Sequence, residues 1–204
     1  MPSSCSCQVQ LAPEDYPGKT TVASAIRFSL CEPKIYGGAM KLESLRELFI
    51  EELQDLYSAE TQIIDALPKM VDQASSPDLK AGFTEHLEQT RQHVRRLDQI
   101  FDQLGDDVDR KDKTCKGMQG IIKDNKDLLK TSAEPEVLDA GMIAGAQRVE
   151  HYEIAAYGTV RTYASLLGNQ SWAQLLQQTL DEEKQTDQKL SDLAERINLE
   201  AKAA

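Results

Sequence analysis

Apolar residues recur with a helical period from Met40 to the end of the chain, but not before it. Residues 1–39 contain four prolines and three glycines and show no sustained period. The sequence therefore predicts a disordered extension over 1–39 that is not part of the fold, and one folded domain over 40–204. We expect Met40 to be the natural start of the protein, which the intact mass of the native protein would show.

Two long amphipathic helices are predicted in the first half of the folded domain. At 100° per residue, the apolar side chains of residues 41–73 fall on one stripe. Pro68 removes one backbone hydrogen bond and should bend this helix without ending it, because the apolar period continues beyond it. A second helix over 78–104 follows a Ser-Ser-Pro-Asp turn and is closed by Gly105.

Two further long helices are predicted in the second half. Residues 105–134 begin with a polar run and continue with spaced apolar residues, which predicts a loop and a short crossover helix. Long helices then run from near 133 to 167 and from 170 to 199. Two hairpins joined by a long connection are the arrangement of a ferritin-like four-helix bundle. An all-α fold also agrees with the content of 40% hydrophobic, 28% charged and only 5% aromatic residues.

Charge and cysteine content exclude several kinds of partner. A net charge of −11 without a basic stripe argues against nucleic acid. The chain lacks a run of about 18 apolar residues and a secretory leader, so we expect a cytoplasmic protein without a membrane partner. Of the four cysteines only Cys115 lies beyond residue 39, so no disulfide framework is indicated.

Small residues over 140–146 would allow close helix packing, within the bundle or across a predicted homodimer.

Acidic residues interrupt the apolar stripes of three predicted helices. Glu60 lies at the centre of the stripe of the 41–73 helix. In the 133–167 helix Glu150 shares a face with apolar residues, and Glu153 flanks it about 60° away. In the 170–199 helix Glu183 lies among apolar residues, with Asp187 one turn further along the same stripe. Five carboxylates are therefore expected to face the core.

Converging buried carboxylates need a positive partner, because an isolated one costs several kcal/mol or takes up a proton. A metal ion is one candidate, and oxygen ligands with one or two histidines favour iron or manganese over structural zinc. The alternative is an ion-pair network with Arg91, Arg148 or Arg161, or contact with a neighbouring subunit. The spacing by itself does not separate the two interpretations.

The 78–104 helix contributes histidines to this pattern. Thr90 lies at the centre of its stripe and is flanked by His86 and His93. These histidines are seven residues apart, which is ~10 Å along a helix axis, so a single metal ion does not easily bind both. We choose His86 as the nitrogen ligand, although either histidine could equally be a hydrogen-bonded residue at the edge of the core. His151 could instead form a hydrogen bond with Glu150 and orient it as a ligand.

Short runs in four places carry a resemblance to a known family: Leu56-Tyr57-Ser58-Ala59-Glu60, Lys116-Gly117-Met118, Val149-Glu150-His151-Tyr152-Glu153-Ile154-Ala155, and Glu182-Glu183-Lys184 with Asp187. Over residues 40–200 the chain resembles the YciE/YciF ferritin-like stress proteins, which implies a ferritin-like fold. The spacing Glu150-x-x-Glu153 followed by Tyr157, and then Glu183, is also similar to the second half of the rubrerythrin di-iron site.

Two positions depart from the di-iron pattern. Ferritin-like sites carry Glu-x-x-His on their second helix. Here Glu88 is followed by Arg91, and Glu88 lies about 160° from Thr90 at the stripe's centre. Asp187 stands where related sites often have histidine, so the implied site is richer in oxygen.

The leading hypothesis is a ferritin-like protein that binds two iron or manganese ions. Its predicted ligands are Glu60, Glu150, Glu153, Glu183 and Asp187, with His86 as a sixth. The reaction would be that of a di-metal oxidoreductase, either iron oxidation or peroxide removal during stress. The competing hypothesis is a metal-free helical scaffold or oligomerisation protein of the stress response, which the missing Glu-x-x-His favours.

Overall fold

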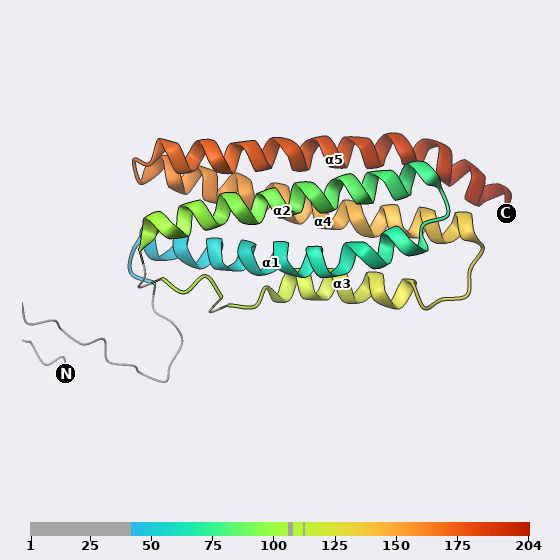
Figure 1. Cartoon of the computed structure of the whole chain (residues 1–204), viewed down its shortest axis with the longest axis horizontal. Coiled ribbons are helices and arrows are strands. Elements are labelled where there is room, and N and C mark those ends of the chain that lie inside the picture. The colour runs from blue at the N-terminus through green and yellow to red at the C-terminus, as the bar shows by residue number, and fades with distance from the viewer. Residues whose placement is uncertain (1–41, 106–107, 112) are drawn as a thin grey trace, which may run out of the picture. The chain divides into compact units, whose positions relative to one another are not determined.

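The structure is a computed structural model that describes residues 42–105, 108–111 and 113–204. These residues are all-helical, as predicted, and contain no strand. The helices are α1 (Leu45–Gln73), α2 (Pro77–Leu104), α3 (Lys116–Leu128), α4 (Pro135–Leu166) and α5 (Gln170–Ala203) (Figure 1). The prediction for residues 1–39 lies outside the described residues.

Local capping explains where the helices begin. Ser44 and Glu47 form a capping box, so α1 starts a few residues later than the predicted position 41. The Ser76 side chain accepts a hydrogen bond from the backbone N–H of Leu79 and so caps α2. Pro68 lies inside α1 and does not end it, in agreement with the prediction. Gly105, at φ 102°, ends α2 with a backbone conformation that favours glycine.

The four long helices pack side by side, each against two others. α1 contacts α2 and α4, and α5 contacts the same two helices from the other side. In Figure 1 each contacting pair of long helices runs in opposite directions, and α3 lies along α1. The short helix packs on α1 and α4. No helix in the described part of the chain has an apolar stretch able to span a bilayer.

Small residues on α4 allow α3 to approach closely. A Cβ atom at Gly145 would lie 1.7 Å from Oδ1 of Asn125, and one at Gly141 would lie 2.8 Å from Cδ2 of Leu128. Glycine at these two positions therefore makes room for α3. The run of small residues over 140–146 thus serves packing within the chain, and the homodimer remains a prediction.

Asp139 of α4 holds the turn between α1 and α2. Its buried carboxylate accepts hydrogen bonds from the Ser75 backbone N–H (2.9 Å) and hydroxyl (2.7 Å) and from the Ser76 backbone N–H (2.7 Å). Hydrogen bonds to a charged acceptor are among the stronger ones in proteins. This contact fixes one end of the α1–α2 hairpin against α4.

Cys115 caps the N-terminus of α3. Its buried sulfur accepts from the Met118 backbone N–H and lies 3.0 Å from the Tyr152 hydroxyl, which donates to Asp55 at 2.7 Å. Burial raises the pKa of the Cys115 thiol, with Asp55 adding to the shift. The thiol is therefore a structural group of the α3 junction.

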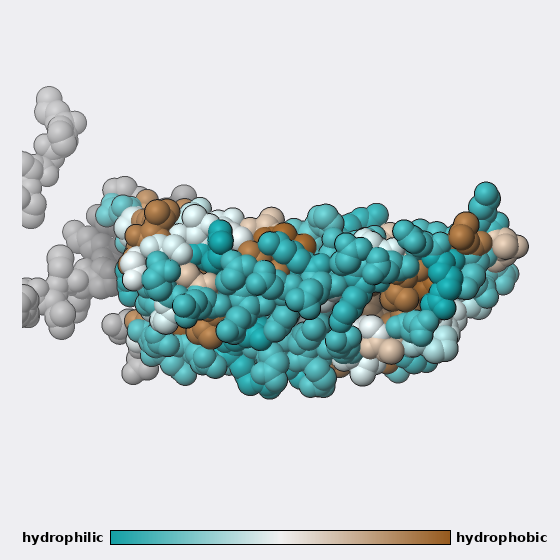
Figure 2. Space-filling model, turned by 90° about the horizontal axis from the view of Figure 1, so that it is seen from above, coloured by the Kyte–Doolittle hydropathy of each residue, from teal (hydrophilic) through white to brown (hydrophobic). Residues whose placement is uncertain are grey.

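The core consists of two apolar clusters separated by a polar layer. One cluster includes Ile63 and Leu67 of α1 and Leu190 of α5, and the other includes Phe49 of α1 and Leu176 of α5. On each long helix the residues of one cluster precede those of the other. Buried acidic or histidine residues lie between the clusters on α2, α4 and α5, and Glu60 lies next to their boundary on α1. The outer face drawn in Figure 2 is largely hydrophilic, with hydrophobic residues in small separate areas.

Candidate metal centre

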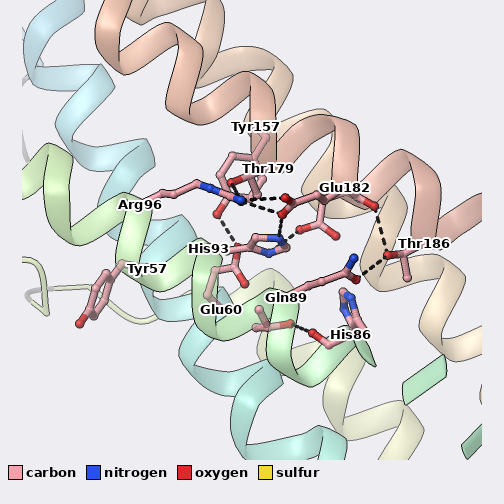
Figure 3. A network of polar contacts seen from close by, with 12 residues as sticks. Tyr57, Glu60, His86, Gln89, His93, Arg96, Tyr157, Thr179, Glu182 and Thr186 are labelled. Atoms are coloured by element: carbon pink, nitrogen blue, oxygen red, sulfur yellow. Dashed lines mark hydrogen bonds and ion pairs between the residues drawn. The ribbon is translucent and has the colours of Figure 1, made fainter. Parts of the chain in front are cut away.

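Every long helix contributes a buried acidic residue or histidine to the polar layer. These residues are Glu60 from α1, His86 and His93 from α2, Glu150 and Glu153 from α4, and Glu183 from α5. Each lies on the apolar face of its helix, which packing turns toward the interior. Figure 3 shows Glu60, His86 and His93 within this layer.

Glu60, His93 and Glu183 form the first trio of potential ligands. Nδ1 of His93 lies 2.9 Å from Oε1 of Glu183 and 3.3 Å from Oε1 of Glu60. No described residue forms a hydrogen bond with Nδ1 of His93 or with either oxygen of Glu183, so these short distances are charge contacts without hydrogen-bond geometry. One atom from each side chain lies within 4.8 Å of the other two.

His86, Glu150 and Glu183 form a second trio. Nε2 of His86 lies 3.4 Å from Oε1 of Glu150, and one ligand atom of each residue again lies within 4.8 Å of the others. Neither ring nitrogen of His86 makes a hydrogen bond within the described residues. Glu183 belongs to both trios, so its two oxygens can serve neighbouring positions.

Glu153 adjoins both trios. It is fully buried, and neither of its carboxylate oxygens forms a hydrogen bond with a described residue. Burial raises the pKa of Glu153 well above its usual value, and the neighbouring Glu60, Glu183 and Glu150 raise it further. A carboxylate left without partners in a buried layer needs either a proton or a cation.

Burial and mutual repulsion dominate the electrostatics of the layer. Burial raises the pKa of Glu60 and Glu150, and the Glu183 carboxylate contributes to both shifts. Burial also lowers the pKa of His86. For His93 burial acts downward, but Glu60 and the carboxylates of residues 182 and 183 outweigh it and raise the pKa. One cationic histidine thus faces several carboxyl groups, which leaves the layer short of positive charge.

A polar network behind His93 orients its ring. Nε2 of His93 lies 2.9 Å from Oε2 of Glu182. Arg96 donates to both oxygens of Glu182, at 2.6 and 2.7 Å, and to the Thr179 hydroxyl at 3.1 Å (Figure 3). Although burial opposes it, hydrogen bonds from His93 and Arg96 lower the pKa of Glu182 to about 2. Nε2 is thereby occupied, and Nδ1 is left facing Glu60 and Glu183.

Two hydroxyl groups border the layer in different ways. The buried Tyr157 hydroxyl donates a hydrogen bond to Oε1 of Glu60, and the Tyr157 ring meets the His93 ring edge to face at 6.3 Å. Thr90, at the centre of the α2 stripe, donates its hydroxyl to the backbone carbonyl of His86 at 2.8 Å. The hydroxyl of Thr90 is therefore used within its own helix.

The structure brings together most of the residues that the sequence selects. Glu60, His86, Glu150 and Glu183 lie in the two trios, and Glu153 adjoins them. The trios do not include Asp187, which is partly exposed and has its Oδ1 3.4 Å from Nε2 of the exposed His151. His151 accordingly faces Asp187, not the buried glutamates.

His93 is the residue that sequence reasoning passed over. The sequence predicts two ions but only His86 as a nitrogen ligand, because a single metal ion does not easily bind two histidines that are seven residues apart. Two adjacent positions can use both, and the structure places His86 in one trio and His93 in the other. The i,i+7 spacing of the two histidines on one helix face was the sequence signal for two adjacent positions.

These features define a class of protein: all-helical, with a buried layer of glutamates and histidines between four long helices. The chain belongs to the family described as a domain of unknown function, DUF892, whose model matches residues 44–203. It is 42% identical over 155 residues to Protein YciF of Escherichia coli strain K12, across 76% of this chain and 93% of that protein. The resemblance to the YciE/YciF proteins is therefore confirmed.

Solved structures agree with this assignment. The crystal structure of the Escherichia coli stress protein YciF matches with a TM-score of 0.73 and 41% identity, covering 76% of this chain and 98% of that chain. YcfI of Rhodopseudomonas palustris matches with a TM-score of 0.71 and 40% identity, covering 76% of this chain and 97% of that chain. The all-helical fold is thus shared with relatives that align over almost their whole length.

Proposed function

We propose that the protein is a ferritin-like four-helix bundle that holds two iron or manganese ions in its buried polar layer. In this arrangement α1, α2, α4 and α5 form the bundle and α3 belongs to the crossover. The observation that carries the proposal is the pair of trios that share Glu183. Buried nitrogen and oxygen atoms without hydrogen bonds to described residues line both.

The donor set fits two divalent cations. Glu60 and His93 would hold one ion and His86 and Glu150 the other. Glu183, which belongs to both trios, and Glu153 would supply further oxygen ligands. Four buried carboxylates would balance two doubly charged ions, which removes the cost of the unpaired acids. Mixed imidazole and carboxylate ligands suit iron and manganese.

The activity supported by this site is oxidative, either oxidation of Fe(II) or removal of peroxide. Bound iron or manganese would supply the redox chemistry and polarise an oxidant. The protein residues contribute geometry and exclusion of water: apolar clusters lie on both sides of the layer, and Glu182 holds the ring of His93 in place. The Tyr157 hydroxyl donates a hydrogen bond to Oε1 of Glu60 and so orients this member of the first trio.

Metal content tests the proposal directly. Protein purified without added metal, and metal-free protein dialysed against Fe(II) without oxygen or against Mn(II), should contain about two ions per chain by mass spectrometry. Glu183→Gln should lose both, because Glu183 belongs to both trios. The exposed Glu88→Gln is the matched control and should retain them.

The outcome also decides between the competing functions. Metal content at background level in the native protein and after dialysis would reject the metal centre and leave the helical scaffold. Asp187→Asn tests the one ligand predicted from the sequence that lies outside the buried layer. Its contact with His151 leads us to expect little change in metal content.

A further inference from the structure

A cavity in the apolar core ends at one of the two trios. Its volume is about 50 Å³, and all five helices contribute to its walls. Its lining includes buried apolar side chains such as Leu67, Phe83, Ile122 and Leu190. His86 and Glu150 also line it, so the cavity reaches the second trio.

The size and walls of the cavity restrict what it can contain. One water molecule needs about 10–15 Å³ by the same measure, so the space accepts only a few atoms of a small molecule. An ion in transit would lose its hydration against apolar walls at a large cost in free energy. A small neutral molecule pays no such penalty, and apolar cavities bind gases such as xenon.

The two trios differ in their surroundings. Glu60 and His93 do not line the cavity, and His93 is backed by the charged pair Glu182 and Arg96. Gln89, which accepts a hydrogen bond from the Thr186 hydroxyl at 3.4 Å (Figure 3), lines the cavity together with Thr186. Of the two trios, the second is therefore the one that adjoins the cavity.

Exposed side chains line the outer part of the cavity. Lys69 of α1 and Lys126 of α3 belong to this rim, together with Glu85 of α2 and Lys189 of α5. Nζ of Lys189 lies 2.8 Å from Oε1 of Glu85, so an exposed ion pair links two helices across the rim. Exposed ion pairs are weak, and such a contact can open without a large loss of stability.

We propose that this cavity binds small neutral apolar molecules, of which dioxygen is the relevant one, and delivers them to the His86 and Glu150 side of the metal centre. The delivery step rests on the proposed function, whereas gas binding does not require metal. The two metal positions are then inequivalent, because only the one at His86 and Glu150 adjoins the cavity.

Xenon binding to the metal-free protein tests the cavity without reference to metal. Nuclear magnetic resonance under xenon pressure should shift the methyl signals of Leu67, Ile122 and Leu193, which line the cavity. Ala66→Leu fills the space and should abolish these shifts. Gly82→Ala is the milder variant, because its new methyl would lie 3.9 Å from Cδ1 of Leu193 and cause no clash.

A matched control separates cavity filling from helix stabilisation. Gly120→Ala adds a methyl to an exposed position of α3 that has no atom within 4 Å, so it should leave the xenon shifts unchanged. Absence of xenon shifts at the lining methyls would overturn the proposal. Full xenon shifts in Gly82→Ala and in Ala66→Leu, with normal thermal melts, would overturn it as well.

The delivery step is measured on protein loaded with Fe(II) without oxygen. Mixing with dissolved dioxygen should oxidise the iron at least about tenfold more slowly in Ala66→Leu than in Gly120→Ala, because extra packing volume must be displaced. An unchanged rate at equal iron content would refute delivery through the cavity. A chain that binds no iron would reject the metal centre, while the xenon experiment would still decide whether the cavity binds gas.

Discussion

Replacing Glu153 by leucine tests whether Glu153 is a metal ligand or only a buried acidic residue. Its carboxylate is fully buried and makes no hydrogen bond within the described residues. Leucine has a similar size and removes an unpaired polar group that costs about 1–3 kcal/mol. Glu153→Leu should therefore stabilise the metal-free protein. At about 2–4 °C per kcal/mol for a chain of this length, its Tm should rise by roughly 2–12 °C.

Metal should raise the Tm of the wild type more than the Tm of Glu153→Leu. At a metal concentration 100 times Kd, binding stabilises the folded wild type by about 2.7 kcal/mol, which corresponds to a Tm increase of roughly 5–11 °C. Glu153→Leu lacks one oxygen ligand and one negative charge. A tenfold loss of affinity would remove about 1.4 kcal/mol of that stabilisation, so the metal-induced shift should fall to half or less.

Thermal melts by circular dichroism, with chelator and with Mn(II), measure both effects. Glu195→Leu makes the same change at an exposed position of α5 and controls for the added apolar surface. A lower Tm of Glu153→Leu in chelator would show that the carboxylate stabilises the metal-free fold, against our reasoning. An undiminished Mn(II) shift would show that Glu153 does not take part in binding.

Three further predictions concern protonation, orientation and the fold. Glu150 and Glu153 have raised pKa values, so the metal-free folded state keeps protons that the unfolded chain loses above pH 4.5. Its stability in urea should therefore fall as the pH rises above about 4.5, by up to about 1.4 kcal/mol per pH unit for each group, and a flat profile would refute this. Glu182→Gln should weaken Mn(II) binding about 10- to 100-fold by calorimetry, because His93 loses its charged support, and unchanged affinity would exclude that role. Asp139→Ala removes a buried acceptor of three hydrogen bonds and should lower the Tm by roughly 4–12 °C with normal metal content; a smaller loss would mean that water replaces the carboxylate.

Much of the candidate site could be predicted because an acidic residue in an apolar stripe is visible within one helix. Glu60, Glu150 and Glu183 each interrupt such a stripe, and all three are buried in the structure. Asp187 also lies on a stripe, one turn from Glu183, but the structure places it beside His151 at the partly exposed edge of the α4–α5 contact. Helical periodicity specifies a face, but not how deeply a side chain at the edge of that face is buried.

The sequence by itself determined the all-helical class, the approximate positions of the long helices and the acidic character of the core, because each depends on residues close together in one segment. Only the tertiary structure decided which side chains meet. The rotation and axial register of the packed helices bring Glu183 between His86 and His93, assign each histidine to its own trio and leave a cavity beside only one of them. These relations depend on distances between different helices, which periodicity along a single helix does not contain.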